Sequence, residues 1–136
     1  MMIQSEANQS EAGGKVIHLQ RRGPFTLEQS REMLPLIRKI TERWFCKARE
    51  LANQLEKIAN RNEATVLEDA LNTVLRNWAA QMRQMGLEVK GPWLVDFDSG
   101  DGRYWCWRYP ELQITHWHHH TEGFSARKPI ASNDPQ

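Results

Sequence analysis

The chain has 136 residues, enough for one domain with a single hydrophobic core and no need of disulfides. Its 18 basic and 17 acidic residues give a formal net charge of +1, so no overall field favours nucleic acid or an anionic membrane. Two distant cysteines make no disulfide framework, and neither a secretory signal nor a membrane span is recognisable, so we expect a cytoplasmic protein.

The two ends of the chain are polar. Residues 1–14 and 131–136 are dominated by small, amide and charged side chains. Such segments bury too little apolar surface to offset the entropy lost on ordering, so both are predicted to be disordered tails. Between them we expect a single domain over residues 15–130, with a short extended segment at Lys15–Leu19.

A long amphipathic helix is predicted in the first half of the domain. Thr26 and Gln29 have the spacing of a capping box, which begins a short helix from Leu27 to about Met33. Pro35 lacks a backbone donor and predicts a kink or restart, after which a long helix continues to about Asn60. Its apolar stripe consists of Leu34, Ile37, Thr41, Trp44, Ala48, Leu51, Leu55 and Ile58.

A second helix is predicted from about Ala64 to Met85, after a polar break at Asn60–Asn62. Gly86 is well placed to end it, because glycine readily adopts the left-handed conformation that follows a helix. Two such helices joined by a short turn form a helical hairpin. The second apolar stripe consists of Leu67, Leu71, Val74, Trp78, Met82 and Met85.

The pattern then changes to strands. Trp93–Phe97, Arg103–Tyr109 and Leu112–His118 are predicted strands, and Asp98–Gly102 is a hairpin loop rich in residues that tolerate positive φ. The predicted fold is therefore α+β: a long helical hairpin, preceded by a short helix, packed on a small three-stranded antiparallel β-meander.

Aromatic side chains occupy both faces of the middle strand. Trp105 and Trp107 share one face, and Tyr104 and Cys106 share the other. One of the two faces must belong to the core. We expect the opposite face to be covered by a partner or to form a binding platform.

Four segments carry a family pattern. They read F-T-L-E-Q-S-R-E-M-L-P-L from Phe25, M-G-L-E-V-K from Met85, G-P-W-L-V-D-F from Gly91, and C-W-R-Y-P-E-L-Q-I-T-H-W-H-H-H-T-E-G-F-S-A-R-K-P-I from Cys106. In these segments the chain resembles the family catalogued as domain of unknown function 2203. The resemblance implies a compact cytoplasmic domain with helices followed by strands, and it implies no activity. Matched positions are Trp107, Arg108, Pro110, Glu111, Trp117, His118, Glu122, Gly123, Phe124 and Arg127, whereas His119 and His120 depart from the pattern.

Four histidines in five residues invite a metal hypothesis. On a strand, His116, His118 and His120 would point to one face, and Glu122 could add an oxygen ligand for zinc. The spacing matches no strong zinc signature. The alternative is a strand end with solvated histidines, which we favour for His119 and His120.

A second candidate is a polar cluster around His118. Its spacing from Glu122 suggests an acid–base pair across a tight turn, with Arg108 and Arg127 as charge partners. The alternative, which we favour, is a buried polar lock that fixes the C-terminal segment against the sheet. The full cluster is Arg108, Glu111, His118, Glu122 and Arg127, with an aromatic lining of Trp105, Trp107, Trp117 and Phe124.

Two functional hypotheses follow. The first is a non-catalytic interaction domain without a cofactor, which forms a homo-oligomer, a dimer by preference, and contacts an unknown protein partner. The reason for this hypothesis is that a helical hairpin of this length exposes more apolar surface than a three-stranded sheet can cover. The alternative is a small metal- or ligand-binding enzyme that uses His118 and Glu122. No phosphate-binding loop, nucleophile motif or nucleic-acid module is present in the sequence.

Overall fold

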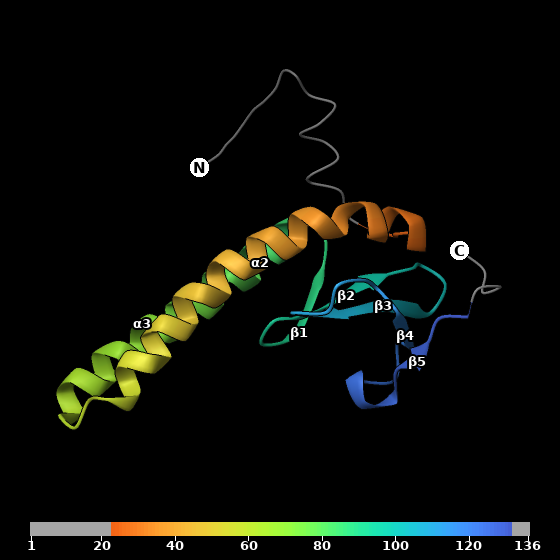
Figure 1. The fold of residues 1–136 in the computed structure, drawn as a ribbon. Helices are drawn as coiled ribbons and strands as arrows, with labels where there is room; N and C mark the ends of the chain where they lie inside the picture. Colours follow the sequence, from red (N-terminus) through yellow and green to blue (C-terminus); the bar gives the residue numbers. More distant parts are fainter. Residues whose placement is uncertain (1–22, 132–136) are drawn as a thin grey trace, which may run out of the picture.

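A computed structural model describes residues 23–131. The predictions for the tail at 1–14, for Lys15–Leu19 and, apart from Ala131, for the tail at 131–136 fall outside it. Two helices form a long hairpin whose base lies against one face of a five-stranded antiparallel sheet (Figure 1). The predicted α+β class and the packed helical hairpin are confirmed. No helix within residues 23–131 is long and apolar enough to cross a membrane.

The first helix, α2, spans Leu27–Glu56 without interruption. The capping box is present: Gln29 N–H donates to Thr26 Oγ1 at 3.0 Å, and Thr26 N–H donates to Gln29 Oε1 at 2.9 Å. The predicted separate short helix with a restart at Pro35 is wrong. Pro35 is exposed, so water can bond the carbonyl that loses its helical donor, while buried side chains on either side hold both turns in the core. Figure 1 shows α2 changing direction in its orange N-terminal part.

The second helix, α3, spans Arg61–Gln84. Asn60 caps it by accepting a hydrogen bond from Glu63 N–H at 3.0 Å, and Gly86 follows its end with a φ of 89°. The prediction for this helix is therefore confirmed to within a few residues. Near the sheet, the indole N–H of Trp78 donates to Thr41 Oγ1 at 2.9 Å and ties α3 to α2 inside the core.

The far end of the hairpin extends beyond the sheet as a two-helix arm (Figure 1). We call residues 49–77 the hairpin arm. None of the residues in this fully described range is buried, although both apolar stripes continue through it. Toward the sheet, by contrast, Ala48 and Trp78 on either side of the range are buried. The hairpin arm thus lacks the third layer that covers the base of the hairpin.

The sheet has five strands rather than the predicted three, and each strand pairs with its neighbour in chain order. The two additional strands, at the edges, are only four and two residues long. The last predicted strand begins four residues later than expected, because Leu112 is 73% exposed and lies outside the sheet. The strands are β1 (Glu88–Gly91), β2 (Leu94–Asp98), β3 (Arg103–Arg108), β4 (His116–His119) and β5 (Lys128–Pro129).

The strand register decides which face is core. Phe97, Trp105 and Trp117 lie opposite one another on β2, β3 and β4, and Val95 lies opposite Trp107. Residues directly opposite in antiparallel strands share a face. Trp105 and Trp107 are fully buried and pack with core residues of both helices. The face carrying Tyr104 and Cys106 is therefore the outer face, turned away from the helices.

Candidate functional site

Three buried polar side chains meet on the outer face of the sheet. Asp96 on β2 lies opposite Cys106 on β3. His118 on β4 lies opposite Tyr104, which is two residues from Cys106 on β3 and therefore on the same face. Asp96, Cys106 and His118 are 1%, 1% and 2% exposed. A carboxylate oxygen, the thiol sulfur and a ring nitrogen all lie within 4.8 Å of one another. We call this set the Asp–Cys–His centre.

The imidazole of His118 is held at both nitrogens. Nε2 lies 3.0 Å from Asp96 Oδ2, and Nδ1 lies 2.9 Å from the backbone oxygen of His119. Both neighbours are acceptors, whereas a neutral imidazole has only one N–H. Both contacts of the imidazole can be satisfied only if the Asp96–His118 pair carries an extra proton or if a cation binds between the two side chains.

The second carboxylate oxygen of Asp96 has no partner. Oδ1 is buried and makes no hydrogen bond to any residue in the described part of the chain. Burial raises the pKa of the Asp96 carboxyl, while the neighbouring His118 and then the Cys106 thiol act in the opposite direction. An unpaired buried acceptor costs about 1–3 kcal/mol, so Asp96 is poorly satisfied by protein groups alone.

Cys106 is a thiol rather than a reactive thiolate. Burial, followed by the charge of Asp96, raises the pKa of Cys106 to about 12. The guanidinium of Arg127 lies 3.9 Å from the sulfur and does not outweigh these effects. A nucleophilic role is therefore disfavoured, whereas a bound metal ion would deprotonate the thiol outright.

A pocket of about 250 Å³ opens beside the Asp–Cys–His centre. One wall comes from the sheet, including Lys90 and Leu94 on β1 and β2. The other wall comes from Glu122, Gly123 and Phe124, where the chain enters the short 3-10 helix η1 (Phe124–Ala126). The C-terminal segment thus folds under the outer face and closes one side of the pocket.

The predicted charge cluster is split between two places. Arg127, rather than Arg108, forms a bidentate pair with Glu111, with Nη2 at 2.5 Å and Nη1 at 3.3 Å from the two carboxylate oxygens. Arg108 contributes its backbone N–H, at 2.9 Å from Glu111 Oε1. Burial opposes ionisation of Glu111, but the hydrogen bonds from Arg127 and Arg108 lower the pKa of its carboxyl. Both guanidiniums lie over the ring of Phe124, at 4.1 and 5.0 Å.

Glu122 is not placed against the imidazole of His118. Its Oε1 accepts from the backbone N–H of His119 at 3.2 Å and from Lys128 Nζ at 3.0 Å. The hydrogen bond from Lys128 is the main reason that the pKa of Glu122 is lowered. Asp96 takes the carboxylate position beside His118 that the sequence suggested for Glu122, although Glu122 still lines the same pocket.

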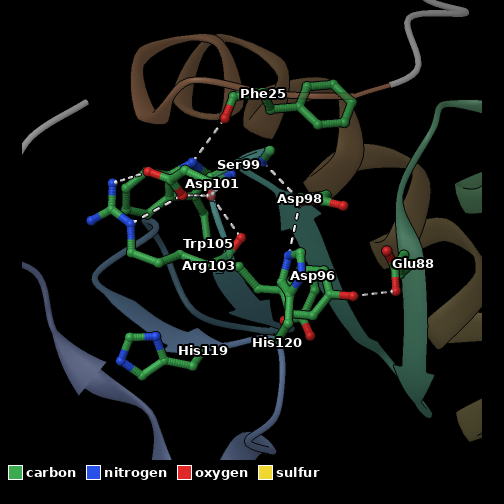
Figure 2. A network of polar contacts seen from close by, with 12 residues as sticks. Phe25, Glu88, Asp96, Asp98, Ser99, Asp101, Arg103, Trp105, His119 and His120 are labelled. Atoms are coloured by element: carbon green, nitrogen blue, oxygen red, sulfur yellow. Dashed lines mark hydrogen bonds and ion pairs between the residues drawn. The ribbon is translucent and has the colours of Figure 1, made fainter.

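The histidine run does not converge on one ligand set. His116 Nδ1 lies 2.9 Å from Thr115 Oγ1, and His120 Nε2 lies 3.0 Å from Asp98 Oδ1. Figure 2 shows His120 reaching Asp98, while His119 lies apart from this network. Within residues 23–131, only His118 of the proposed zinc ligands belongs to a group that could hold a metal.

The predicted aromatic lining is also divided. Trp105 and Trp107 belong to the core on the other face of the sheet. Trp117 shares that face, where it packs against the core and lies beside Lys128 of β5. Of the four aromatic residues proposed, Phe124 alone lines the pocket on the outer face of the described structure.

Comparison with known protein families identifies the family to which this fold and site belong. The family described as "Uncharacterized conserved protein (DUF2203)" matches residues 24–130. The chain belongs to the DUF2203 family. The match spans both helices and all five strands, so it includes the Asp–Cys–His centre and its pocket, and the resemblance inferred from the four sequence segments is confirmed. Neither the curated proteins nor the solved structures contain a match to the chain.

Sequence reasoning missed Asp96 as a site residue. The sequence signal for Asp96 is its position between Val95 and Phe97, as the one polar residue of the predicted strand Trp93–Phe97. Alternation places such a residue on the face opposite the core, where a buried carboxylate needs a partner or an ion. Cys106 was expected to be a small buried group, and its burial is confirmed.

Proposed function

We propose that this DUF2203 protein binds a divalent transition metal, with zinc as the best fit, at the Asp–Cys–His centre. We further propose that the metal offers an open coordination position to the adjacent pocket. The observation that carries the proposal is the convergence of three buried ligand-type atoms within 4.8 Å, on a carboxylate that still has one unpaired oxygen.

The donor set selects the class of metal. Carboxylate oxygen, thiolate sulfur and imidazole nitrogen together suit zinc and similar ions, whereas Ca²⁺ and Mg²⁺ prefer oxygen ligands. The contact from His118 Nδ1 to the His119 carbonyl supports this role, because metal-binding imidazoles are oriented in that way. The other nitrogen, Nε2, faces Asp96 Oδ2 and would bind a metal held between the two side chains. A tetrahedral zinc site needs ligand separations of roughly 3.3–3.8 Å, which small side-chain rotations here would supply.

Three protein ligands leave a fourth position for water or a small ligand. The pocket beside the centre has room for one, with the Lys90 ammonium and the Phe124 ring in its walls. This arrangement supports the alternative hypothesis of a small metal- or ligand-binding enzyme, with Asp96 in place of Glu122. A metal-bound water would make hydrolysis or hydration the available reaction class.

Metal binding is tested with protein purified without an affinity tag. We expect about one equivalent of zinc by elemental analysis, and a thiolate-to-cobalt charge-transfer band after exchange into Co²⁺. Cys106→Ser should abolish that band. Cys46→Ser is the matched control and should keep it, because Cys46 is exposed on α2, outside the centre.

A second control addresses the surface histidines. His119→Ala should leave zinc stoichiometry unchanged, since its ring lies outside the Asp–Cys–His centre. Protein that takes up no metal at micromolar excess would refute the proposal. A cobalt band that survives in Cys106→Ser would refute this ligand set.

A second candidate function is self-association through the hairpin arm. The supporting observation is that no residue from 49 to 77 is buried, although this range carries many large aliphatic side chains. Partly buried examples are Leu51, Leu55, Leu67, Leu71 and Val74. Two helices without a third layer cannot cover such stripes, whereas two hairpins together make a four-helix bundle.

The charge of the hairpin arm favours a second copy of this chain as the occupant. Residues 49–77 hold four basic side chains (Arg49, Lys57, Arg61, Arg76) and five acidic ones (Glu50, Glu56, Glu63, Glu68, Asp69), a net charge of −1. With so small a net charge, two such arms repel each other little. A strongly charged partner would gain little electrostatic attraction from binding one. A twofold interface would pair each arm with its own copy.

Self-association is tested by sedimentation at micromolar concentration. We expect a dimer, and we expect Leu71→Glu to give a folded monomer because it buries two symmetry-related charges in the interface. Asn72→Glu, an exposed neighbour on the same helix, serves as the matched control and should remain dimeric. A parent protein that is monomeric across this concentration range would rule out the dimer.

A further inference from the structure

We propose a second ligand site, for a small organic carboxylate, between the N-terminal part of α2 and the chain before β4. A pocket of about 280 Å³ lies there, and it shares no lining residue with the pocket beside the Asp–Cys–His centre. It is lined by Arg31, Leu34, Pro35, Arg38, Leu112, Gln113 and Ile114. The inference is independent of the proposed metal site.

Arg38 supplies an unsatisfied hydrogen-bond donor. Its side chain is half-buried, and its Nε is a buried donor with no hydrogen-bond partner in the described residues. None of the ion pairs within residues 23–131 involves Arg38, although Glu42 lies one helical turn away. A buried guanidinium donor without a partner is costly, and an anion in the pocket would satisfy it.

Arg31 supplies a second, oriented guanidinium. It lies two helical turns before Arg38, so both residues are on the same face of α2, separated by about 10.5 Å of helix rise. Arg31 Nη2 donates to the backbone oxygen of Ile114 at 3.1 Å, which fixes the group at the pocket and leaves its other donors available. Two arginines thus border one small cavity.

The remaining walls define the chemical class of the ligand. Among residues 23–131, no carboxylate lines the pocket, so no internal anion competes. Leu34, Pro35 and Leu112 are apolar, and Leu112 at 73% exposure is the most exposed large hydrophobic residue described. A guanidinium fork matches a planar carboxylate, and the apolar walls match a short hydrocarbon or aromatic group. These features favour a small monocarboxylate over inorganic phosphate.

The test is an NMR titration of the full chain with benzoate, with benzamide as the uncharged counterpart. We expect saturable shifts from benzoate at residues that line the pocket, and none of comparable size from benzamide. Arg38→Gln should weaken benzoate binding about tenfold or more, because it removes a charged hydrogen-bond partner. Arg43→Gln makes the same charge change at an exposed position of α2 outside the pocket and should bind like the parent.

Three outcomes would overturn the inference. They are absence of saturable benzoate binding, equal binding by benzamide, and equal weakening in Arg38→Gln and Arg43→Gln. Inorganic phosphate that binds as tightly as benzoate would overturn the choice of a carboxylate. Because the lining residues lie outside the Asp–Cys–His centre, the result does not depend on whether metal is bound.

Discussion

Trp105→Ala will lower the free energy of unfolding by about 3–5 kcal/mol, a large share of the stability of a domain of this size. Trp105 is fully buried, and it lies between Phe97 and Trp117 on the core face of the sheet. Removing the indole leaves a cavity that neighbouring strands cannot fill. Urea unfolding should show a lower midpoint with an unchanged slope.

A hydrogen bond adds to this packing loss. The indole N–H of Trp105 donates to the backbone oxygen of Phe25 at 2.9 Å, and the backbone N–H of Phe25 donates to the backbone oxygen of Asp98 at 2.7 Å. Figure 2 shows the first of these bonds, from Trp105 to the Phe25 oxygen. Trp105→Phe keeps much of the ring but leaves the Phe25 oxygen unpaired, so it should cost about 1–3 kcal/mol.

The control for this series is Leu112→Ala. Leu112 is 73% exposed, so its truncation should change stability by no more than about 0.5 kcal/mol. If Trp105→Phe costs as much as Trp105→Ala, the contribution of the indole is mainly polar. If Trp105→Ala costs no more than Leu112→Ala, the core face of the sheet has been assigned incorrectly.

The helices were predictable because local signals determine them. Thr26 with Gln29 before α2 and Gly86 after α3 are short-range signals of helix ends, and each is used as expected. Asn60, which was predicted only as part of a polar break, caps α3. The apolar stripes repeat over many turns and leave little ambiguity. Pro35 misled because its local cost is modest at an exposed position, while the tertiary packing of Leu34 and Ile37 favours one continuous helix.

The edge strands were missed because they carry too little pattern. β5 consists of Lys128 and Pro129 alone, and two residues display no alternation. β1 is four residues long and ends at Gly91 beside a turn. Both strands exist because a neighbouring strand offers them a hydrogen-bonding edge, which is a property of the assembled sheet.

The site was located in the right part of the chain but with the wrong partners. His118 was identified, yet its carboxylate partner comes from 22 residues earlier, on another strand. Cross-strand register decides which side chains meet, and a slip of one residue would turn each of them to the opposite face. Glu122 is near His118 in sequence, which made it the obvious candidate, whereas Asp96 is near only after the sheet has formed.

Asp96→Asn will bind zinc at least about 100-fold more weakly than the parent. Loss of a side chain that only hydrogen-bonds to a metal ligand usually weakens metal binding by about 10- to 100-fold, so a direct ligand should exceed that range. The variant replaces an anionic ligand atom of the proposed site with a neutral amide. The measurement is competition for zinc against a chelator dye at neutral pH. Binding within a fewfold of the parent would exclude Asp96 as a ligand.

The same variant will be more stable than the parent when metal is absent, by about 1 kcal/mol or more. The new amide can donate to His118 Nε2 while Nδ1–H donates to the His119 oxygen, so a neutral imidazole satisfies both contacts without a buried charge. Zinc at 100 times the parent's dissociation constant would stabilise the parent by about 2.7 kcal/mol and the variant by no more than about 0.4 kcal/mol. The order of stability should therefore reverse on adding zinc. If Asp96→Asn is less stable in both conditions, the Asp96–His118 pair is a structural contact and the carboxylate has no metal to bind.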